Sequence, residues 1–327
     1  MKKRVVLLGG DSPLGREVKE RLEAAVPHAS IRLTGGIPAP TEDDEEPDEV
    51  VALDAEALDN AAAVICAADA ATARRAWDLA GGVPGGPVFV DLSYGLESLP
   101  EARLRSAFGA GLPPETSVQI TAHPAASALA LLVRRLTARY AFRNIVAQIF
   151  EPASERGTAG VTELQKQMVS LLSFKPMEKK VFDAQAAFNM LGRYGEDAPE
   201  KLEDIELRIE RHLASLLAGS GPMPSLRLIQ APVFHGYTFC LWLEFETRPA
   251  IEDIEADLES EHVEVRAADV EPPSNVGAAG QGGVTTGLIE ADRNNPRAVW
   301  LWAAADNYRI SADSAAAAVV QILAGGE

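Results

Sequence analysis

The chain is poor in cysteine, in aromatic residues and in positive charge. Of its 327 residues only 2 are cysteine and 6% are aromatic, and 30 lysines and arginines stand against 48 aspartates and glutamates, a net charge of -18. Two isolated cysteines exclude a disulfide framework and a metal-binding cysteine pair, and we expect Cys66 and Cys240 to be buried thiols. The negative charge opposes binding to nucleic acid or to anionic lipid.

Long hydrophobic runs are absent as well. No apolar stretch approaches the roughly 20 residues that a membrane-spanning helix needs. Residues 1–4 lead into only a short apolar run before Gly9, so we expect no export signal. The sequence therefore predicts a cytoplasmic protein with no membrane partner and no nucleic-acid partner. With 47% hydrophobic and 24% charged residues the chain is globular, and its length favours two domains.

The first half of the chain alternates short apolar runs with amphipathic stretches, which is the pattern of an α/β domain with a parallel sheet. Strands are predicted at residues 4–8, 30–33, 49–53, 62–66, 87–91 and 117–121, and helices at 12–25, 70–79 and 127–140. Residues 38–49 combine prolines with acidic side chains that repel one another, so we predict an exposed loop there.

Past residue 140 the pattern changes to longer strands, which indicates an α+β domain. Strands are predicted at residues 145–150, 227–229, 234–247, 285–291 and 299–304, and helices at 162–172, 202–217 and 314–323. The segment 234–247 alternates polar and apolar side chains, as an antiparallel strand does when only one of its faces is buried. A sheet with two such faces is suited to pairing with another subunit.

A series of short segments, in order along the chain, resembles motifs of the aspartate-semialdehyde dehydrogenase family. Val5–Gly15 corresponds to the family's first strand and glycine loop, and Ala122–Ala128 corresponds to the motif Ala-Asn-Pro-Asn-Cys-Ser-Thr. Phe150–Val161 corresponds to Tyr-Gln-Ala-Val-Ser-Gly-Ala-Gly-Lys-Ala-Gly-Val, and Ala187–Asn189 to Ala-Phe-Asn. Ala231–Tyr237 corresponds to Val-Pro-Val-Phe-Arg-Gly-His, and Trp302–Arg309 to Trp-x-x-Ala-Asp-Asn-Leu-Arg.

The resemblance implies a fold and an assembly. Residues 1–125 are expected to form a Rossmann-type, doubly wound parallel sheet, and residues 126–305 an α+β dimerisation domain with a largely antiparallel sheet. Residues 306–327 are expected to form a helix that returns to the first domain. The implied partner is a second copy of the chain, bound through the sheet of the second domain; a heterodimer with an active homologue is the alternative.

The same resemblance shows that the family's catalytic groups are replaced. The nucleophilic cysteine falls on Ala126, whose methyl group cannot form a covalent thioester, and the general-base histidine falls on Tyr237, a poor base at neutral pH. The family's substrate-binding arginine and lysine are replaced here by Gln230 and Glu206, and its phosphate-binding arginine by Glu97. The family's glutamine that orients the reacting group is replaced by Glu151. We therefore predict a pseudoenzyme with no catalytic residue and no metal site. If these three carboxylates face one cleft, a cationic ligand is a further option.

The glycine loop is the candidate nucleotide site. Its cofactor-binding candidates are Gly9, Asp11, Ser12, Pro13 and Leu14. In the family, backbone N–H groups of this loop point at a pyrophosphate from the start of a helix. Here Pro13 has no N–H and Asp11 brings a carboxylate, whereas Ser12 is a good helix N-cap and Pro13 a good first helical residue. Residues 34–73 contain no lysine or arginine for a 2′-phosphate, so NADP is disfavoured, NAD remains an alternative, and no cofactor is the preferred prediction.

The preferred function is a non-catalytic homologue that acts as a dimeric binding or scaffolding protein. One alternative is an oxidoreductase or hydrolase with a relocated site, in which Ser127 is the nucleophile and His235 or His123 the base. On a strand, His235 and Tyr237 would share a face, roughly 6 to 7 Å apart. Another alternative is a nucleotide-binding sensor without turnover. Hydrogen-bonded histidines with no catalytic role are the simpler interpretation.

Overall fold

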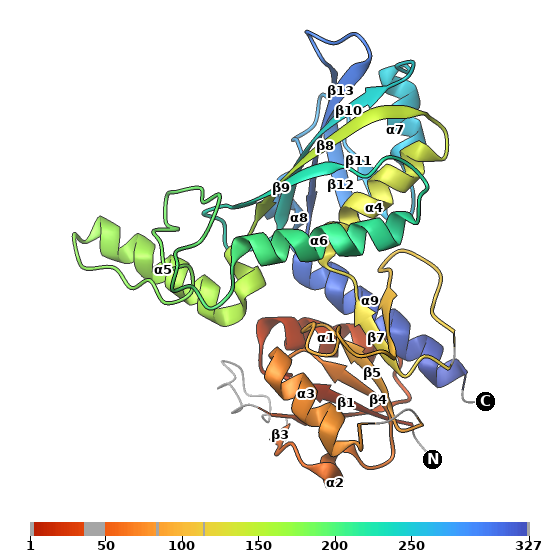
Figure 1. The fold of residues 1–327 in the computed structure, drawn as a ribbon, viewed down its shortest axis with the longest axis vertical. Coiled ribbons are helices and arrows are strands. Elements are labelled where there is room, and N and C mark those ends of the chain that lie inside the picture. Colours follow the sequence, from red (N-terminus) through yellow and green to blue (C-terminus); the bar gives the residue numbers. More distant parts are fainter. Residues whose placement is uncertain (1–2, 36–49, 83–84, 114, 326–327) are drawn as a thin grey trace. The chain divides into compact units, whose positions relative to one another are not determined.

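The computed structural model describes residues 3–35, 50–82, 85–113 and 115–325, so the loop predicted at residues 38–49 lies outside the described part. The chain divides into two compact units, one of residues 1–122 with 311–327 and one of residues 123–310. Each unit contains its own β-sheet among the described residues (Figure 1).

The sheet of the first unit is parallel at every described pairing, in the order β3-β2-β1-β4-β5-β7-β6. Its strands are β1 (Arg4–Leu8), β2 (Ser30–Thr34), β3 (Val50–Val51), β4 (Ala61–Cys66), β5 (Val88–Asp91), β6 (Ala102–Arg105) and β7 (Val118–Thr121). Its helices are α1 (Pro13–Ala25), α2 (Ala55–Leu58), α3 (Ala70–Leu79) and the part of α9 (Asn307–Ala324) that follows residue 310. The strand order reverses between β1 and β4, so the predicted doubly wound α/β sheet is confirmed.

Successive side chains of β1 point to opposite faces of this sheet and enter two different cores. Val5 packs in a cluster with residues of α1 and with Val319 of α9. Val6 packs in a cluster on the other face with Trp77 of α3. The C-terminal helix thus completes the same core as the N-terminal strand (Figure 1).

The sheet of the second unit is mixed, in the order β11-β12-β13-β10-β8-β9. Its strands are β8 (Phe142–Glu151), β9 (Ser225–Gln230), β10 (Tyr237–Phe245), β11 (Val263–Val265), β12 (Val284–Ala291) and β13 (Ala298–Ala305). Its helices are α4 (Pro124–Thr137), η1 (Ala153–Arg156), α5 (Gly157–Leu172), α6 (Leu202–Leu217), α7 (Ile251–Leu258) and α8 (Asn275–Ala278). The central pairings are antiparallel and the two edge pairings are parallel.

Several element ends differ from the sequence predictions. The strand predicted at residues 234–247 is only Tyr237–Phe245, because Gly236 adopts a φ of 81° that extended backbone excludes. Helix α4 begins at Pro124 rather than at residue 127, and α9 begins at Asn307 rather than at residue 314. The sequence does not predict β6, whose side chains at the sheet edge are mostly half-buried and give no clear alternation.

One face of the second unit's sheet is open. Alternate side chains of β8, β10 and β13 are buried, and the intervening ones are half-buried or exposed. The register places Trp242 opposite both Val146 and Trp300, and both indole N–H groups donate to Asp292 Oδ2, at 2.8 and 2.9 Å. We call this surface the open sheet face; its larger apolar members are Val146, Phe150, Cys240, Trp242, Trp300 and Trp302.

The two cysteines differ in exposure. Cys66 is buried in β4 as predicted, and burial raises the pKa of its thiol well above the usual value. Cys240 is only half-buried because it lies on the open sheet face, so the prediction of a buried thiol is wrong there. Among the described helices none is long and apolar enough to cross a membrane. The described His, Cys, Asp and Glu side chains include no group of three or more that could hold a metal ion.

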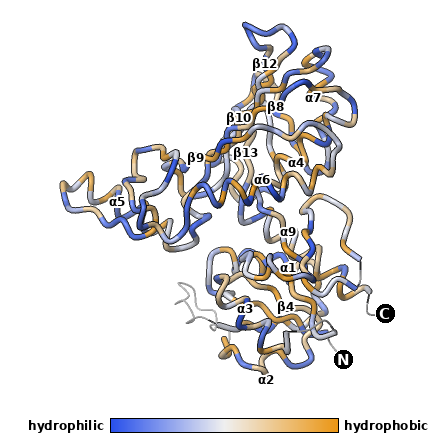
Figure 2. Tube along the Cα trace, in the orientation of Figure 1, coloured by the Kyte–Doolittle hydropathy of each residue, from blue (hydrophilic) through white to orange (hydrophobic). Residues whose placement is uncertain are grey.

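Helix α5 and the segment that follows it extend away from the rest of the second unit (Figure 1). We call residues 157–190 the α5 arm. Figure 2 shows hydrophobic residues along its outer part.

Candidate functional site

Ala126, at the position of the family's nucleophile, lies in the first turn of α4. His123 is the N-cap, with its Nδ1 accepting a hydrogen bond from the Ala125 N–H at 3.3 Å, and Pro124 is the first helical residue. Ala126 is 0% exposed. The methyl group of Ala126 is therefore not accessible to solvent.

Tyr237, at the position of the general base, is buried and hydrogen-bonded. Its hydroxyl donates to Glu151 Oε2 at 3.4 Å. Its ring lies edge-on to the imidazole of His123, with 6.1 Å between the ring centroids. Because His123 caps the turn of α4 that contains Ala126, the positions of the nucleophile and of the base lie in the same part of the second unit.

Glu151 and Gln230 end the neighbouring strands β8 and β9, where they are register partners. The Tyr194 hydroxyl lies 2.6 Å from Gln230 Oε1 and 3.3 Å from Glu151 Oε1. The Gln230 amide donates to the backbone carbonyls of Glu151, at 3.0 Å, and of Ala231, at 2.9 Å. The Gln230 side chain is thus engaged by the protein on both its oxygen and its nitrogen, and it is not directed at a ligand.

Arg156 places its positive charge beside the buried carboxylate of Glu151. Its Nη2 lies 3.3 Å from Glu151 Oε1, and its Nη1 pairs with Glu200, which also accepts from Arg208 Nη1 at 3.1 Å. Burial by itself would lower the pKa of Arg156, but the neighbouring acidic groups, Glu151 foremost and then Tyr194, Glu155 and Tyr237, together outweigh it and the pKa is raised. Burial also raises the pKa of Glu151, and the charge of Arg156 opposes that shift.

A second carboxyl group, Glu155, faces His123, with 3.7 Å between Oε2 and Nε2. Burial, reinforced by the negative charge of Glu151, raises the pKa of Glu155 to about 7. Burial, reinforced by His212 and two arginines, lowers the pKa of His123 well below 6.5. At neutral pH the histidine is therefore uncharged. We call the whole set the buried network: His123, Glu151, Glu155, Arg156, Tyr194, Glu200, Arg208, Gln230 and Tyr237.

The remaining acidic substitutions are engaged elsewhere. The carboxylate of Glu206 accepts the N–H of Leu228 at 2.6 Å and Nη1 of Arg227 at 3.1 Å, which ties α6 to β9. Glu97 belongs to the first unit, next to a loop that Asp91 closes by accepting backbone N–H groups. Glu151 and Glu206 are each held by protein partners, so these two carboxylates do not offer a cation an open acidic pocket.

The residues considered for a relocated site differ in exposure. Ser127 is buried in α4, and its N–H donates to His123 O at 2.9 Å. His235 is exposed and precedes β10. Because Gly236 interrupts the extended backbone, the prediction that His235 and Tyr237 share a strand face is wrong. His123 does lie beside Tyr237, as a buried neutral imidazole rather than as a surface or cleft histidine.

The glycine loop of the first unit fits a dinucleotide poorly. The Ser12 N–H donates to Gly9 O at 3.0 Å, and Ser12 Oγ caps α1 by accepting from the Gly15 N–H at 2.9 Å. Pro13, the first helical residue, has no N–H to offer. A Cβ on Gly15 would lie 1.9 Å from Gly9 O, so the close approach of helix and loop explains this glycine without a ligand. The residues present therefore do not form the pyrophosphate cradle of the family.

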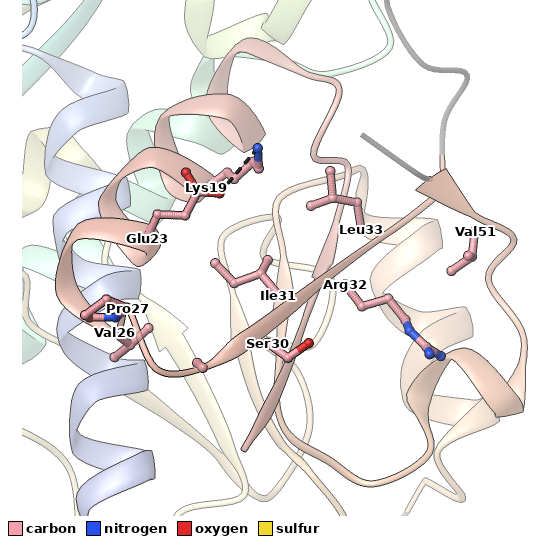
Figure 3. A pocket seen from close by; sticks show the side chains of 10 residues that line it. Lys19, Glu23, Val26, Pro27, Ser30, Ile31, Arg32, Leu33 and Val51 are labelled. Carbon is pink, nitrogen blue, oxygen red and sulfur yellow. Dashed lines mark ion pairs between the residues drawn. The ribbon is translucent and has the colours of Figure 1, made fainter. Parts of the chain in front are cut away.

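A hollow of about 620 Å³ opens beside β2 in the first unit (Figure 3). Its walls come from α1, including the ion pair of Lys19 with Glu23 at 3.4 Å, and from β2, with Val51 of β3 at one end. It follows the length of β2, and none of its lining residues belongs to the glycine loop. This hollow is not the predicted nucleotide site.

Sequence reasoning missed five members of the buried network: Glu155, Arg156, Tyr194, Glu200 and Arg208. Glu155 and Arg156 stand where the family motif beside Phe150–Val161 has Gly-Ala, and this exchange of two small residues for two charged ones is the signal that marks them. Tyr194 lies in no motif, and only the fold brings its hydroxyl to Gln230.

The doubly wound first unit and the α+β second unit together define the two-domain architecture of the semialdehyde dehydrogenases. Residues 135–310 match the family model for the semialdehyde dehydrogenase dimerisation domain. Since this match spans more than half of the chain, the chain belongs to that family.

Relatives with curated sequences match part of the chain. A USG-1 protein homolog from Pseudomonas aeruginosa is 33% identical over 158 residues, 48% of this chain and 47% of the relative. A USG-1 protein homolog from Azotobacter vinelandii is 29% identical over 198 residues, 60% of this chain and 59% of the relative. Aspartate-semialdehyde dehydrogenase from Shewanella violacea is 25% identical over 208 residues, 62% of each chain. The chain thus spans about half to three fifths of the length of these relatives.

Solved structures match nearly the whole chain. A probable aspartate-semialdehyde dehydrogenase from Pseudomonas aeruginosa has a TM-score of 0.80 at 24% identity, over 99% of this chain and 98% of the other. Aspartate semialdehyde dehydrogenase II from Vibrio cholerae, complexed with ASA, has a TM-score of 0.81 at 17% identity, over 99% of each chain. At these identities the likeness establishes the fold.

Proposed function

We propose that the chain is a non-catalytic member of the semialdehyde dehydrogenase family that works as a dimeric binding or scaffolding protein. The observation that carries the proposal is the state of the nucleophile position. Ala126 offers a methyl group where a thiolate would have to attack an aldehyde, and it is fully buried.

The substitutions around Ala126 support a structural use of the old site. Where the family motifs have Gln, Gly, Ala and His, the chain has Glu151, Glu155, Arg156 and Tyr237. All four residues are larger than, or charged differently from, the groups they replace, and they bond within the buried network. Buried charges are stable only when they are paired and hydrogen-bonded, so the network keeps the site closed.

We further propose that the protein functions without NAD or NADP. Support for this comes from the glycine loop, in which the Ser12 and Gly15 N–H groups are used within the protein and Pro13 has none. A scaffolding protein needs the first unit as a folded body, and the cap at Ser12 and the close approach at Gly15 serve that purpose without a ligand.

The proposed partner is a second copy of the chain, bound through the open sheet face. The family match to a dimerisation domain supports this. The face also carries exposed Trp300 and Val146 on a regular sheet, and large aromatic residues on a rigid surface are typical anchors of protein interfaces. The shared contact of Trp242 and Trp300 with Asp292 holds both indoles in place before any partner binds.

The test is a turnover assay of the purified full chain with aspartate semialdehyde, phosphate and NAD or NADP, followed by nicotinamide absorbance. We expect no turnover above the protein-free reaction, beside an active aspartate-semialdehyde dehydrogenase as positive control. Ala126→Cys should remain inactive, because Tyr237 occupies the position of the base and the new thiol is buried.

A thiol reagent provides the structural readout for Ala126→Cys. The new thiol should react more slowly than the half-buried Cys240 of the same chain. Turnover by the unaltered chain would contradict the proposal outright. Rapid modification at position 126, together with activity in Ala126→Cys, would show that the site is open and that only the nucleophile is missing.

A further inference from the structure

Arg105 is a buried arginine of the first unit that has no acidic partner among the described residues. It ends strand β6 and is 4% exposed. Burial lowers the pKa of its guanidinium and is the only cause of the shift, so no described acidic group lies near enough to oppose it. The guanidinium still keeps its charge at neutral pH. Arg105 therefore places a positive charge inside the protein without the compensation that a buried charge needs.

A second buried arginine shows the contrast. Arg156 of the second unit is paired with Glu151, with 3.3 Å between Nη2 and Oε1. Arg105 instead contacts neutral acceptors, since its Nη1 donates to Gln119 Oε1 at 3.2 Å and to Gln321 Oε1 at 2.9 Å. An amide oxygen orients a guanidinium but carries no full negative charge. The charge of Arg105 thus remains available to an anion.

The unused donors lie on one face of the first unit's sheet. Both glutamines bond to Nη1 of Arg105, whereas its Nε is buried and has no hydrogen-bond partner among the described residues. Thr121, the register partner of Arg105 on β7, has a buried hydroxyl that likewise lacks a described partner. Because Gln119, two residues before Thr121, faces Arg105, Thr121 points to the same side of the sheet. Buried donors without an acceptor are costly, and one anion between these two residues accepts from both.

These donors stand where a parallel sheet places its ligands. Arg105 and Thr121 are the last residues of their strands, and open α/β sheets bind ligands outside the carboxyl ends of the strands. Strands β4 and β5 separate β7 from β1, so this position is distinct from the glycine loop. The loop after β6 is fixed against α9, because Gln321 Nε2 donates to Leu112 O and a Cβ on Gly111 would lie 2.1 Å from Gln321 Oε1.

We propose that Arg105 is the anchor of a binding site for a small monocarboxylate, with the hydroxyl of Thr121 as a further donor. A guanidinium binds a carboxylate through two parallel N–H bonds, and Nε belongs to such a fork. The charges balance one to one, whereas a phosphate monoester carries nearly two negative charges at neutral pH. Binding here depends neither on the dimer nor on the buried network, since β6, β7 and residues 311–327 all belong to the first unit.

The experiment compares the full chain in sodium acetate and in sodium chloride of the same ionic strength. Acetate is the probe, and it should raise the melting temperature of wild type by roughly 2–4 °C over chloride. Arg105→Gln removes the charge and should abolish this rise. Arg103→Gln is the matched control, because Arg103 lies two residues earlier on the same strand and is exposed; it should keep the rise.

Hydrogen exchange of the wild-type chain gives a second measurement, which decides alone if Arg105→Gln does not fold. Acetate should slow the exchange of amides in β6, β7 and the last turns of α9 about tenfold and leave β10 and β13 unchanged.

Three outcomes would overturn the assignment. The first is an equal melting temperature in acetate and in chloride together with unaltered exchange in β6. The second is a rise of the same size in Arg105→Gln, since acetate would then act elsewhere. The third is a rise in sodium phosphate and none in acetate, which would assign the donors to a tetrahedral anion. The non-catalytic proposal stands or falls separately, by the turnover assay.

Discussion

The carboxyl group of Glu155 makes the buried network sensitive to pH. Burial raises its pKa from the usual 4.5 to about 7, so the folded protein keeps this proton over a pH range in which the unfolded chain has released it. The stability from this group is therefore complete below pH 4.5 and is lost as pH rises through about 7. At about 1.4 kcal/mol per pKa unit, the full effect is on the order of 3 kcal/mol.

Glu155→Gln removes this ionisation and keeps the shape of the side chain. Relative to wild type, the variant's free energy of unfolding should rise by roughly 1–3 kcal/mol between about pH 5 and pH 8, as measured by urea unfolding. Glu178→Gln, on the exposed arm, is the control and should show no such trend. The pKa of His123 is lowered, so His123 has the opposite effect: as pH falls below 6.5 it lowers stability. His123 is present in wild type, in Glu155→Gln and in Glu178→Gln alike. A difference that does not change with pH would contradict the assignment.

The role of a single residue could be predicted where it depends on residues close to it in the sequence. Ser12 caps α1 and Pro13 is its first residue, as the sequence predicts, because both roles depend on the next few residues. Arg156 could not be assigned in this way, since its partner Glu200 comes from a later segment. The error at His235 has a similar cause: a Cβ at position 236 would lie 3.0 Å from the backbone oxygen of Asn275, a proximity that no local pattern contains.

Among the elements, the α5 arm has one side chain, Glu163, that accepts several hydrogen bonds from distant backbone. Glu163 accepts three backbone N–H groups of the segment that returns along α5. Glu163→Ala leaves these donors without an acceptor, at a cost of roughly 2–3 kcal/mol. We expect hydrogen exchange of the amides at residues 180–182 to become about tenfold to hundredfold faster, because the arm opens locally before the second unit unfolds.

A substitution on the same arm provides the comparison. Glu178 is exposed, and its side chain pairs only at the surface with Lys166 and Lys180. Glu178→Ala should change stability by less than about 0.5 kcal/mol and leave the protection of residues 180–182 unaltered. Equal exchange rates in wild type and Glu163→Ala would show that the arm is held by its apolar contacts.

Regular elements could be predicted well when their pattern was simple. Helices α3 and α6 match the predicted residues 70–79 and 202–217, since each has an amphipathic sequence with a clear buried side. Helix α5 begins at Gly157, five residues before its predicted start, and its buried side includes Glu163 and Gln167. These polar residues are buried because they bond to backbone that is distant in the sequence. The spacing of apolar residues therefore does not predict that they face inward.

At the scale of the whole molecule, the first unit depends on the far end of the chain. Val319 of α9 is 0% exposed in the core that contains Val5 of β1, whereas its neighbour Val320 is 43% exposed. Val319→Ala should lower the stability of the first unit by about 2 kcal/mol. Val320→Ala, the matched control, should have an effect within about 0.5 kcal/mol.

The measurement is hydrogen exchange under native conditions, resolved by unit. Val319→Ala should increase exchange in β1 and β4 and leave β8 and β10 unchanged. Increased exchange spread over both sheets would show that the two units unfold together. The doubly wound sheet itself could be predicted from its alternating pattern and from the motifs that resemble the family, because both are properties of many residues at once.

The distribution of tryptophan has an optical consequence. Of the chain's four tryptophans, Trp77 is buried in the first unit, and the other three, Trp242, Trp300 and Trp302, lie on the open sheet face. The intrinsic fluorescence of the protein therefore comes mainly from a single surface, and two of its indoles share the carboxylate of Asp292. Emission from the unlabelled chain thus reports directly whether that surface faces water or another protein.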